Sequence, residues 1–458
     1  MKNIFISYFF FIFLLCMPIV LSLSPYIKLP VYSHHTTPPK SNETTKMSYY
    51  KYFHDNNIYT ILEIGSPSQK IVAKLNMEEF SFFIYYNRCD IPSSFDLNSS
   101  QTYTKSPFQN LLTDIYVYTY LINDTFYFYD INSNKYTYNL TYLFSPVNKD
   151  SSEQKIEKYP YTCADLGLKL AKPETKAYNF NYNFIMELKL SEAINEYSFF
   201  IEYNNNKDNS NNEGNLIIGV EPYVYNKGKY KLSQLREIES VMYDLNLYWQ
   251  LKFNEIYFNI NNSRIDLPIL DVGLNHNLNI IIAPVDYMEI IQEEFFNKGQ
   301  RNCRRNRLEN NFYNFDCDSL KDLENFPTIF FLHRTLGKTF EVNAQDIFVE
   351  YDGKYISLIW IDMRYRNNWR MGKPFLKKYF FSFNEDKKII GFYDLKNIDN
   401  DKESKVNLRN VIYLIVIIVL LLFIGILAFV FAKIFYTIKK PKKRANLLED
   451  TTDNPINE

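Results

Sequence analysis

The feature of this sequence that most constrains its fold is a long succession of strand-like segments that begins at Tyr49. Apolar and polar residues alternate in segments such as IYTILEI, KIVAKLN, TFYFYDI and YTYNLTYLF. A period of two, with many aromatic and β-branched residues, is typical of strands that bury one face. Few segments predict helices, chiefly one from Phe184 to Ile194 and one that begins after Pro284. The chain is therefore predicted to be mainly β.

A repeated pattern within this region indicates two lobes. In VAKLNMEEFSFFI, and again in GLNHNLNIIIAP, a strand is followed by a short polar turn and then by an apolar run. The 458 residues of the chain are enough for two domains or for one large bilobal domain. We expect two packed, β-rich lobes, an N-terminal lobe at residues 49–225 and a C-terminal lobe at residues 226–397.

The N-terminus has the pattern of a secretory signal peptide. Lys2 precedes a long apolar run that ends near Ser22 and Ser24, so we predict a signal peptide at residues 1–23. An uncleaved membrane anchor is the alternative interpretation of this run. Residues 24–48 are rich in Pro, Ser and Thr without a clear period, which predicts a flexible lead-in. The His34–His35 pair within it has no further ligand nearby, so we predict no metal site.

A second apolar segment, near the C-terminus, predicts one membrane-spanning helix. Residues 411–432 carry no charged side chain and are long enough to cross a bilayer of about 30 Å. A basic cluster between Lys433 and Arg444 follows, and basic residues favour the cytoplasmic side. With the signal peptide, this predicts a type I membrane protein of the secretory pathway or cell surface. Its ectodomain is lumenal or extracellular, its stalk is at 398–410 and its cytoplasmic tail at 433–458.

Cysteines and glycosylation sequons agree with a lumenal or extracellular location. Cys16 leaves with the signal peptide, and the even number of cysteines that remains suits an oxidising compartment. The net charge of −1 gives no field that would favour nucleic acid, and no motif indicates a cofactor. All of the N-x-S/T sequons precede the predicted span. They begin at Asn42, Asn98, Asn123, Asn139 and Asn261.

Six segments, in order along the chain, resemble motifs of the pepsin-like (A1 family) aspartic proteases. IGSPSQ resembles the turn IGTPxQ that precedes the first catalytic strand of that family. WRMGKPFLKKYFFSFNEDKKIIGFYDLK resembles the segment that begins W-x-L-G-D-x-F-L-R. The resemblance covers nearly the whole predicted ectodomain and implies the bilobal pepsin-like acid protease fold. The other segments are FDLNSSQTY, NLIIGVEPYVYNKGKYKL, YWQLKFNEIYF and CDSLKDLENFPTIFF.

The resemblance also implies where a catalytic site would lie. Members of the family place one Asp-Thr-Gly loop in each lobe, and the two aspartates share a proton. The matching positions here are two triplets, NME at Asn76–Glu78 and NHN at Asn275–Asn277. Asparagine has nearly the shape of aspartate but cannot ionise or hold the shared proton. The resemblance therefore implies a degenerate member in which Asn76 and Asn275 replace both catalytic aspartates.

Three acids are candidates for a replacement dyad. Asp271 begins an Asp-Val-Gly sequence just before the second triplet, but its use would require extra residues in a strand and loop of fixed length. Glu78 and Glu79 have longer side chains that start from other backbone positions, so a shared-proton distance would be difficult to hold. The alternative is that Asp271 is a turn acid and that the two glutamates form a solvated pair.

The same resemblance implies a flap residue and disulfides. Tyr118 occupies the position of the family's flap tyrosine. Cys303 and Cys317 match the disulfide of the C-terminal lobe. Cys89 matches the first cysteine of a small N-terminal loop whose usual second cysteine is absent, so a bond between Cys89 and Cys163 remains one option.

Taken together, these patterns predict a catalytically inactive, aspartic-protease-like type I membrane glycoprotein. Its ectodomain is expected to bind an extended peptide or a protein, because the family's fold carries a long cleft. One alternative is a membrane-tethered aspartic endopeptidase with a non-standard dyad. Another is a structural partner in a membrane complex.

Overall fold

The computed structural model describes residues 26–33, 58–85, 95–109, 120–129, 134–145, 162–169, 183–204, 212–240, 249–260, 263–267, 271–308, 311–351, 353–363, 368–395, 425, 427 and 429–434. The chain divides into two units, residues 1–395 and residues 396–458. In the second unit, residues 429–434 are helical. Among the described residues, no helix combines the length and the apolarity needed to cross a membrane. The predicted signal peptide and most of the predicted span lie outside these residues and stay predictions.

Strands dominate the first unit, which confirms the mainly β prediction. The strands of its N-terminal half are β1 (Ile27–Ser33), β2 (Ile58–Ile64), β3 (Gln69–Asn76), β4 (Phe82–Tyr85), β5 (Thr104–Gln109), β6 (Tyr120–Tyr129), β7 (Lys135–Ser145), β8 (Ala164–Gly167), β9 (Ser198–Tyr203) and β10 (Asn212–Ile218). Those of its C-terminal half are β11 (Leu235–Glu239), β12 (Gln250–Lys252), β13 (Glu255–Ile260), β14 (Ser263–Leu267), β15 (Asp271–Leu274), β16 (Ile281–Ala283), β17 (Cys303–Arg307), β18 (Phe312–Cys317), β19 (Ile329–His333), β20 (Lys338–Val342), β21 (Phe348–Tyr351), β22 (Lys354–Ser357), β23 (Ile359–Asp362), β24 (Trp369–Met371), β25 (Phe380–Asn384) and β26 (Ile389–Tyr393).

The helices of the described part are short, and the two predicted ones are present. Asn183 caps the first of them, because its side chain accepts hydrogen bonds from the N–H groups of Ile185 and Met186. The second begins after Pro284 and continues into a π-helix. The helical segments are η2 (Leu97–Ser99), α3 (Phe184–Leu190), α4 (Pro222–Tyr225), η3 (Leu232–Gln234), α5 (Val285–Ile290), η4 (Ile291–Asn297), η6 (Leu320–Leu323), α6 (Ala344–Ile347) and α7 (Lys373–Leu376).

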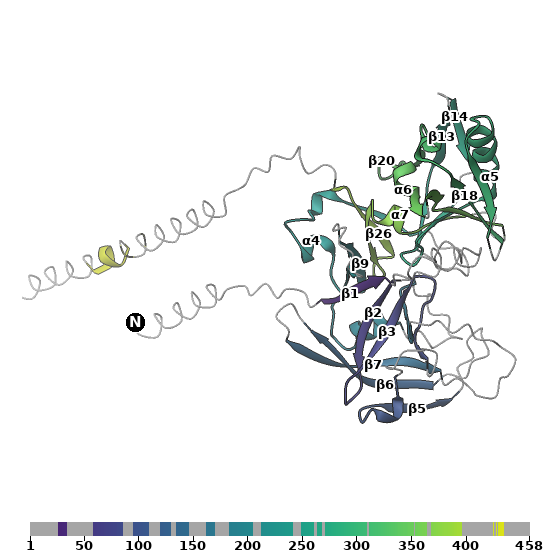
Figure 1. Ribbon diagram of the computed structural model, residues 1–458. Helices are drawn as coiled ribbons and strands as arrows, with labels where there is room; N and C mark the ends of the chain where they lie inside the picture. The colour runs from purple at the N-terminus through teal and green to yellow at the C-terminus, as the bar shows by residue number, and fades with distance from the viewer. Residues whose placement is uncertain are drawn as a thin grey trace, which may run out of the picture. The chain divides into compact units, whose positions relative to one another are not determined.

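One 13-stranded sheet runs through both halves of the first unit. Its order is β11-β26-β25-β9-β10-β1-β2-β3-β8-β4-β7-β6-β5. Strand β9 of the N-terminal half pairs antiparallel with β25 of the C-terminal half, with Phe200 opposite Ser382. Figure 1 shows β1, β9 and β26 between the other N-terminal strands and the C-terminal ones. Main-chain hydrogen bonds within this shared sheet therefore join the two halves.

The flexible lead-in predicted at residues 24–48 is wrong for its described part, because Ile27–Ser33 form β1. This strand pairs antiparallel with β10 and, at its end, with β2. Ile27, Leu29 and Val31 are buried in alternation, so a period of two was present. Pro30 and the Pro-rich residues that follow obscured it. At Pro30 the strand pairs with β10 alone among the described residues, and proline is tolerated where one edge is free.

The repeated sequence pattern corresponds to a repeated arrangement of strands. In the N-terminal lobe β3 pairs parallel with β8, β8 antiparallel with β4, and β4 parallel with β7. In the C-terminal lobe β15, β24, β16 and β23 pair in the same order with the same directions. Strand β3 ends at Asn76, and β15 ends one residue before Asn275. The two triplets therefore lie at the ends of equivalent strands.

Buried aromatic rings hold both arrangements in place. In the N-terminal lobe the ring centroids of Phe82 on β4 and Phe126 on β6 are 5.7 Å apart. In the C-terminal lobe Trp369 on β24 lies 5.5 Å from Tyr287 and 5.2 Å from Phe331. All of these rings are buried, and such pairs add about 1 kcal/mol to the stabilisation from burial alone.

Candidate functional site

The loop that follows β3 is held by its own asparagine. The Oδ1 atom of Asn76 accepts a hydrogen bond from the N–H group of Glu78 at 3.1 Å, and its carbonyl oxygen accepts one from Leu168 at 2.8 Å. Gly167 lies opposite Asn76 in the pair of β3 and β8. A Cβ atom at Gly167 would lie 2.3 Å from the carbonyl oxygen of Phe80, so this position requires glycine.

The loop that follows β15 is built in the same way. The Oδ1 atom of Asn275 accepts a hydrogen bond from the N–H group of Asn277 at 2.9 Å. The N–H group of Asn275 donates to the carbonyl oxygen of Met371, also at 2.9 Å. A Cβ atom at Gly372 would lie 2.2 Å from the carbonyl oxygen of Ile280. In each lobe, therefore, an asparagine side chain closes the turn, and a crowded glycine lies at the end of the neighbouring strand.

A polar contact joins the two loops. The Nδ2 atom of Asn275 donates a hydrogen bond to Oε1 of Glu78 at 2.9 Å. The guanidinium group of Arg370, on β24, donates to the same oxygen at 3.2 Å. The side chains of Arg370 and Glu78 are 30% and 43% exposed, so water screens their attraction. Among the described contacts, Glu78 provides the carboxylate that meets the second triplet.

The other two candidate acids lie elsewhere. Oε1 of Glu79 accepts hydrogen bonds from the N–H groups of Phe80 at 3.0 Å and Ser81 at 3.4 Å. Burial raises the pKa of Glu79, against the lowering effect of these two N–H groups. Asp271 is the first residue of β15, and the length of the strand separates it from Asn275 by about 13 Å. Neither acid contacts a triplet asparagine in the described part of the chain.

The middle residues of the triplets, Met77 and His276, are both buried but differ in their contacts. Met77 packs in the apolar core. The Nδ1 atom of His276 is hydrogen bonded to the phenolic oxygen of Tyr203, on β9, at 2.8 Å. Burial, with a further contribution from the charge of Lys373, lowers the pKa of His276 to about 3. His276 is therefore neutral near pH 7 and ties the second loop to the shared sheet.

A buried ion pair lies close to the second loop. The Nζ atom of Lys373, in α7, is 3.8 Å from Oε1 of Glu213 on β10, and Nζ of Lys377 is 2.6 Å from Oε2. Burial lowers the pKa of Lys373 to about 8. Burial alone would raise the pKa of Glu213, but the charges of Lys373 and Lys377 lower it to about 2. This cluster links α7 to the shared sheet.

The described cysteines are disulfide-bonded. Cys303 and Cys317 form the bond that was predicted for the C-terminal lobe. Cys163 is also disulfide-bonded, while its suggested partner Cys89 lies outside the described residues. The other predicted site residues outside these ranges are Tyr118, Asn42 and Asn261.

The remaining sequons lie in the N-terminal lobe. Asn98 in η2 and Asn139 on β7 are exposed, whereas Asn123 on β6 is half-buried. Nδ2 of Asn123 donates a hydrogen bond to Oγ1 of Thr141 at 3.2 Å, and Oγ1 of Thr125 donates to Oδ1 of Asn139 at 3.1 Å. The asparagine of each strand thus contacts the hydroxyl group of the other strand's sequon. Glycosylation at these positions stays a prediction.

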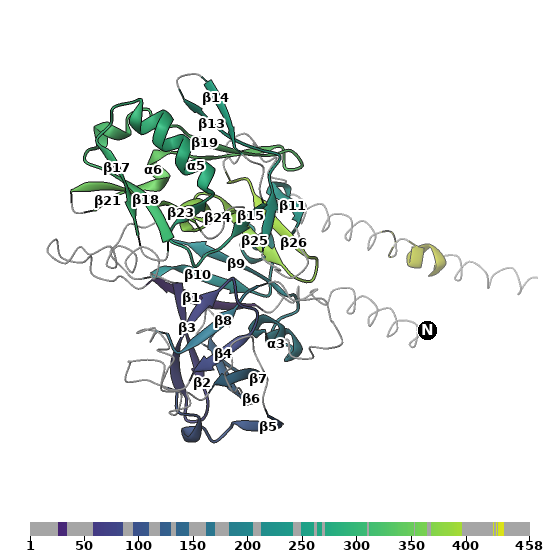
Figure 2. The ribbon, with the colours of Figure 1, turned by 90° about the vertical axis from the view of Figure 1, so that its right-hand side faces the viewer.

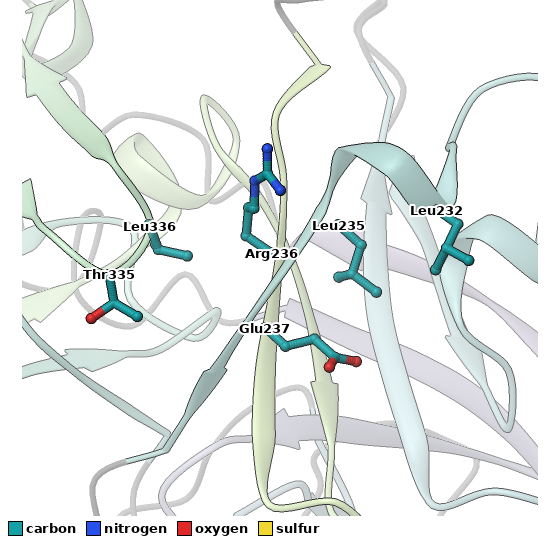
Figure 3. A pocket seen from close by; sticks show the side chains of 6 residues that line it. All are labelled: Leu232, Leu235, Arg236, Glu237, Thr335 and Leu336. Atoms are coloured by element: carbon teal, nitrogen blue, oxygen red, sulfur yellow. The ribbon is translucent and has the colours of Figure 1, made fainter.

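A surface pocket of about 330 Å³ lies outside the two loops. It is formed by η3 and β11 on one side and by the turn between β19 and β20 on the other (Figure 3). No triplet residue contributes to it. The residues that line it are Leu232, Leu235, Arg236, Glu237, Thr335 and Leu336.

The shared sheet, the repeated strand arrangement and the paired loops define a bilobal acid-protease fold. The family model described as eukaryotic aspartyl protease matches residues 59–395. This match covers most of the chain, so the chain belongs to the eukaryotic aspartyl protease family. A comparison with curated proteins finds no match.

Three residues beside the loops were not predicted from the sequence. Lys373 stands where the motif W-x-L-G-D-x-F-L-R has its acid, and that replacement was the available signal for the buried ion pair. Arg370 occupies a variable position of the same motif, so the motif gave no signal for it. Tyr203 is one of 39 tyrosines and is distinguished only by its contact with His276.

Proposed function

We propose that this chain is a catalytically inactive member of its family, a type I membrane glycoprotein that binds extended peptide or protein segments without cleaving them. The observation that carries the proposal is the contact between the loops. Asn275 and Arg370 both donate to Glu78, and Asn76 occupies the end of the equivalent strand.

The contacts of Glu78 differ from those of a proton-sharing dyad. In a dyad, two carboxyl groups hold one proton between them, and one of them then takes a proton from the attacking water. The amide N–H of Asn275 and the guanidinium of Arg370 act toward Glu78 as hydrogen-bond donors. Neither group can accept a proton from water. The side chain of Asn76 already accepts the N–H group of Glu78. We infer that the site orients polar groups without activating water.

The proposed binding role follows from what the loops retain. The family's fold carries a cleft between its lobes, which suits an extended peptide. Glu78 and Arg370 are partly exposed at the junction of the loops. There Arg370 can donate hydrogen bonds to the main chain of such a peptide, and Glu78 can accept them. The predicted signal peptide, span and sequons support a location in the secretory pathway or at the cell surface for this binding. Exposure of Asn98 and Asn139 supports glycosylation.

A retention experiment tests this proposal. The full-length chain, purified in detergent, is immobilised and incubated with a peptide library, and the retained peptides are identified by mass spectrometry. Intact peptides should be retained, and Glu78→Trp should reduce their retention because the new ring fills the junction of the loops. Asp266→Trp, at an exposed position on β14, is the matched control. Retention that Glu78→Trp leaves unchanged would contradict a role for the loops and favour a structural-partner role of the lobe faces.

The second candidate function is a membrane-tethered aspartic endopeptidase with a non-standard dyad. The position of Glu78 favours it, since this carboxylate reaches the second triplet. A second acid would have to move beside Glu78 for a proton to be shared. Tight binding of pepstatin, lost in Glu78→Gln, would support this function against the first.

A further inference from the structure

Among the described strands, β17 lies at an edge of the C-terminal lobe. In the described part of the chain β17 pairs with β18 and with no other strand. In Figure 2 it lies in the outer part of the lobe, away from β9 and β10. The disulfide between Cys303 and Cys317 joins the two strands at one end, and Phe312 and Phe315 anchor β18 in the core. The edge is therefore held in an extended conformation before any partner arrives.

The register of this pair shows which backbone groups face outward. In an antiparallel pair, opposite residues alternate between those that exchange main-chain hydrogen bonds and those that do not. The N–H group of Leu308 donates to Phe312, and that of Asp318 donates to Asn302, which places the even-numbered residues of this strand in the bonded positions. The main-chain N–H and C=O groups of Arg305 therefore point to the open edge, and so do those of Arg307.

The same two positions carry exposed positive charge. Arg305 and Arg307 lie on one face of β17, two residues and about 7 Å apart. Arg305 lies over the ring of Tyr313 at 5.7 Å, and Arg307 donates to Oδ1 of Asn311 at 3.2 Å. Neither meets a carboxylate in the described contacts. Arg304 differs, because on the opposite face it is paired with Asp316 at 2.8 Å.

We propose that β17 binds an extended peptide with acidic residues at alternating positions, which adds to the edge as a further strand. A residue opposite Arg305 would exchange main-chain hydrogen bonds with it and place its side chain on the same face, and so would the residue opposite Arg307. Two acids spaced by one residue would thus meet both guanidinium groups. This binding site is separate from the triplet loops and does not depend on their proposed function.

Free backbone groups favour a peptide over an unspecific polyanion. A polyanion needs only charge, whereas an added strand also uses the outward N–H and C=O groups. Binding by charge alone and binding by strand addition therefore depend differently on the order of acids in a peptide. They also differ in their response to the loss of peptide N–H groups.

The test uses the full-length chain in detergent and fluorescein-labelled peptides of equal composition, TETETE and TEETTE, of which only TETETE has Glu residues two positions apart. TETETE should bind about tenfold more tightly than TEETTE. Methylation of the amide nitrogens of its Glu residues should abolish binding, because these amides face β17. Methylation of the Thr amides, which face away, should be tolerated.

Protein variants complete the test. The double variant Arg305→Gln/Arg307→Gln should lose the preference for TETETE, while Arg236→Gln on β11, another edge strand, should keep it. If the double variant does not fold, the methylated peptides decide on the unaltered chain. Equal binding of both peptides, or of both methylated forms, would overturn strand addition in favour of an unspecific polyanion patch. Absence of binding would also overturn it and leave the arginines as protection of a free edge. Neither result bears on retention at the loops, which Glu78→Trp tests.

Discussion

The loops after β3 and β15 have similar backbone hydrogen bonds but different surrounding side chains. Each begins with an asparagine whose side chain accepts a hydrogen bond from the N–H group two residues on. Each also has a tightly packed glycine at the end of the neighbouring parallel strand, Gly167 as the last residue of β8 and Gly372 directly after β24. The first loop combines apolar Met77 with exposed Glu78. The second contains buried His276 and adjoins the ion pair of Lys373 and Glu213. The two loops therefore have similar backbone hydrogen bonds although different charged side chains surround them.

The largest effects should come from the two glycines, which test whether the loops share one frame. Gly167→Ala and Gly372→Ala should each lower the free energy of unfolding by about 3 kcal/mol, because a carbonyl oxygen must move to admit the methyl group. Urea titration of the full-length chain measures this. Gly273→Ala is the matched control, since its Cβ would lie 3.9 Å from the nearest atom. A tolerated alanine at either crowded position would break the equivalence.

The second effect is a pH dependence that belongs to one loop. His276 titrates near 6.5 when unfolded and at a pKa of about 3 when folded, so between these values the unfolded chain binds more protons. The contribution of His276 to stability is therefore complete above about pH 6.5 and falls with decreasing pH, by about 2 kcal/mol between pH 6.5 and 5. Glu213 adds a loss only below its ordinary value of 4.5. Unfolding titrations of the native chain and of His276→Gln should differ in slope above pH 5, and equal slopes would contradict the assignment.

The third effect separates the middle residues of the triplets. Tyr203→Phe removes the partner of His276 Nδ1 and should cost about 1.5 kcal/mol, because a buried polar atom loses its hydrogen bond. Met77→Leu keeps an apolar side chain of similar volume and should cost less than about 1 kcal/mol. Thermal unfolding of both variants measures the difference. Equal costs would show that the second loop is not anchored to β9 by this bond.

The smallest effect concerns the contact between the loops. A double-mutant cycle of Glu78→Gln and Arg370→Gln should give a coupling energy below about 1 kcal/mol, because both side chains are partly exposed. The coupling should decrease further in 1 M salt, since surface charges are then screened. A coupling several times larger and independent of salt would mean that water is excluded from this pair.

Local patterns were sufficient to predict most of the fold. The alternation in segments such as Ile58–Ile64 and the order of the family motifs predicted a bilobal, mainly β chain, and the triplets fell at the ends of equivalent strands. The strand at Ile27–Ser33 was missed, because Pro30 weakens the signal and the pairing with β10 joins distant parts of the chain. Short-range patterns do not report such pairing.

The environment of the loops was less predictable for the same reason. Glu78 and Arg370 are 292 positions apart, and Tyr203 and His276 are 73 apart. Folding alone brings these side chains together. The identity of Asn76 and Asn275 was visible in the sequence, whereas the partner of each depended on long-range packing.

The proposal that no two acids share a proton at the loops is tested most directly by hydrolysis. The full-length chain is incubated with an internally quenched peptide library from pH 3 to pH 7, beside Glu78→Gln and the exposed control Asp266→Asn. We predict no fluorescence increase above the buffer for any of the three proteins. Hydrolysis by the native chain that survives in Asp266→Asn and disappears in Glu78→Gln would contradict the account.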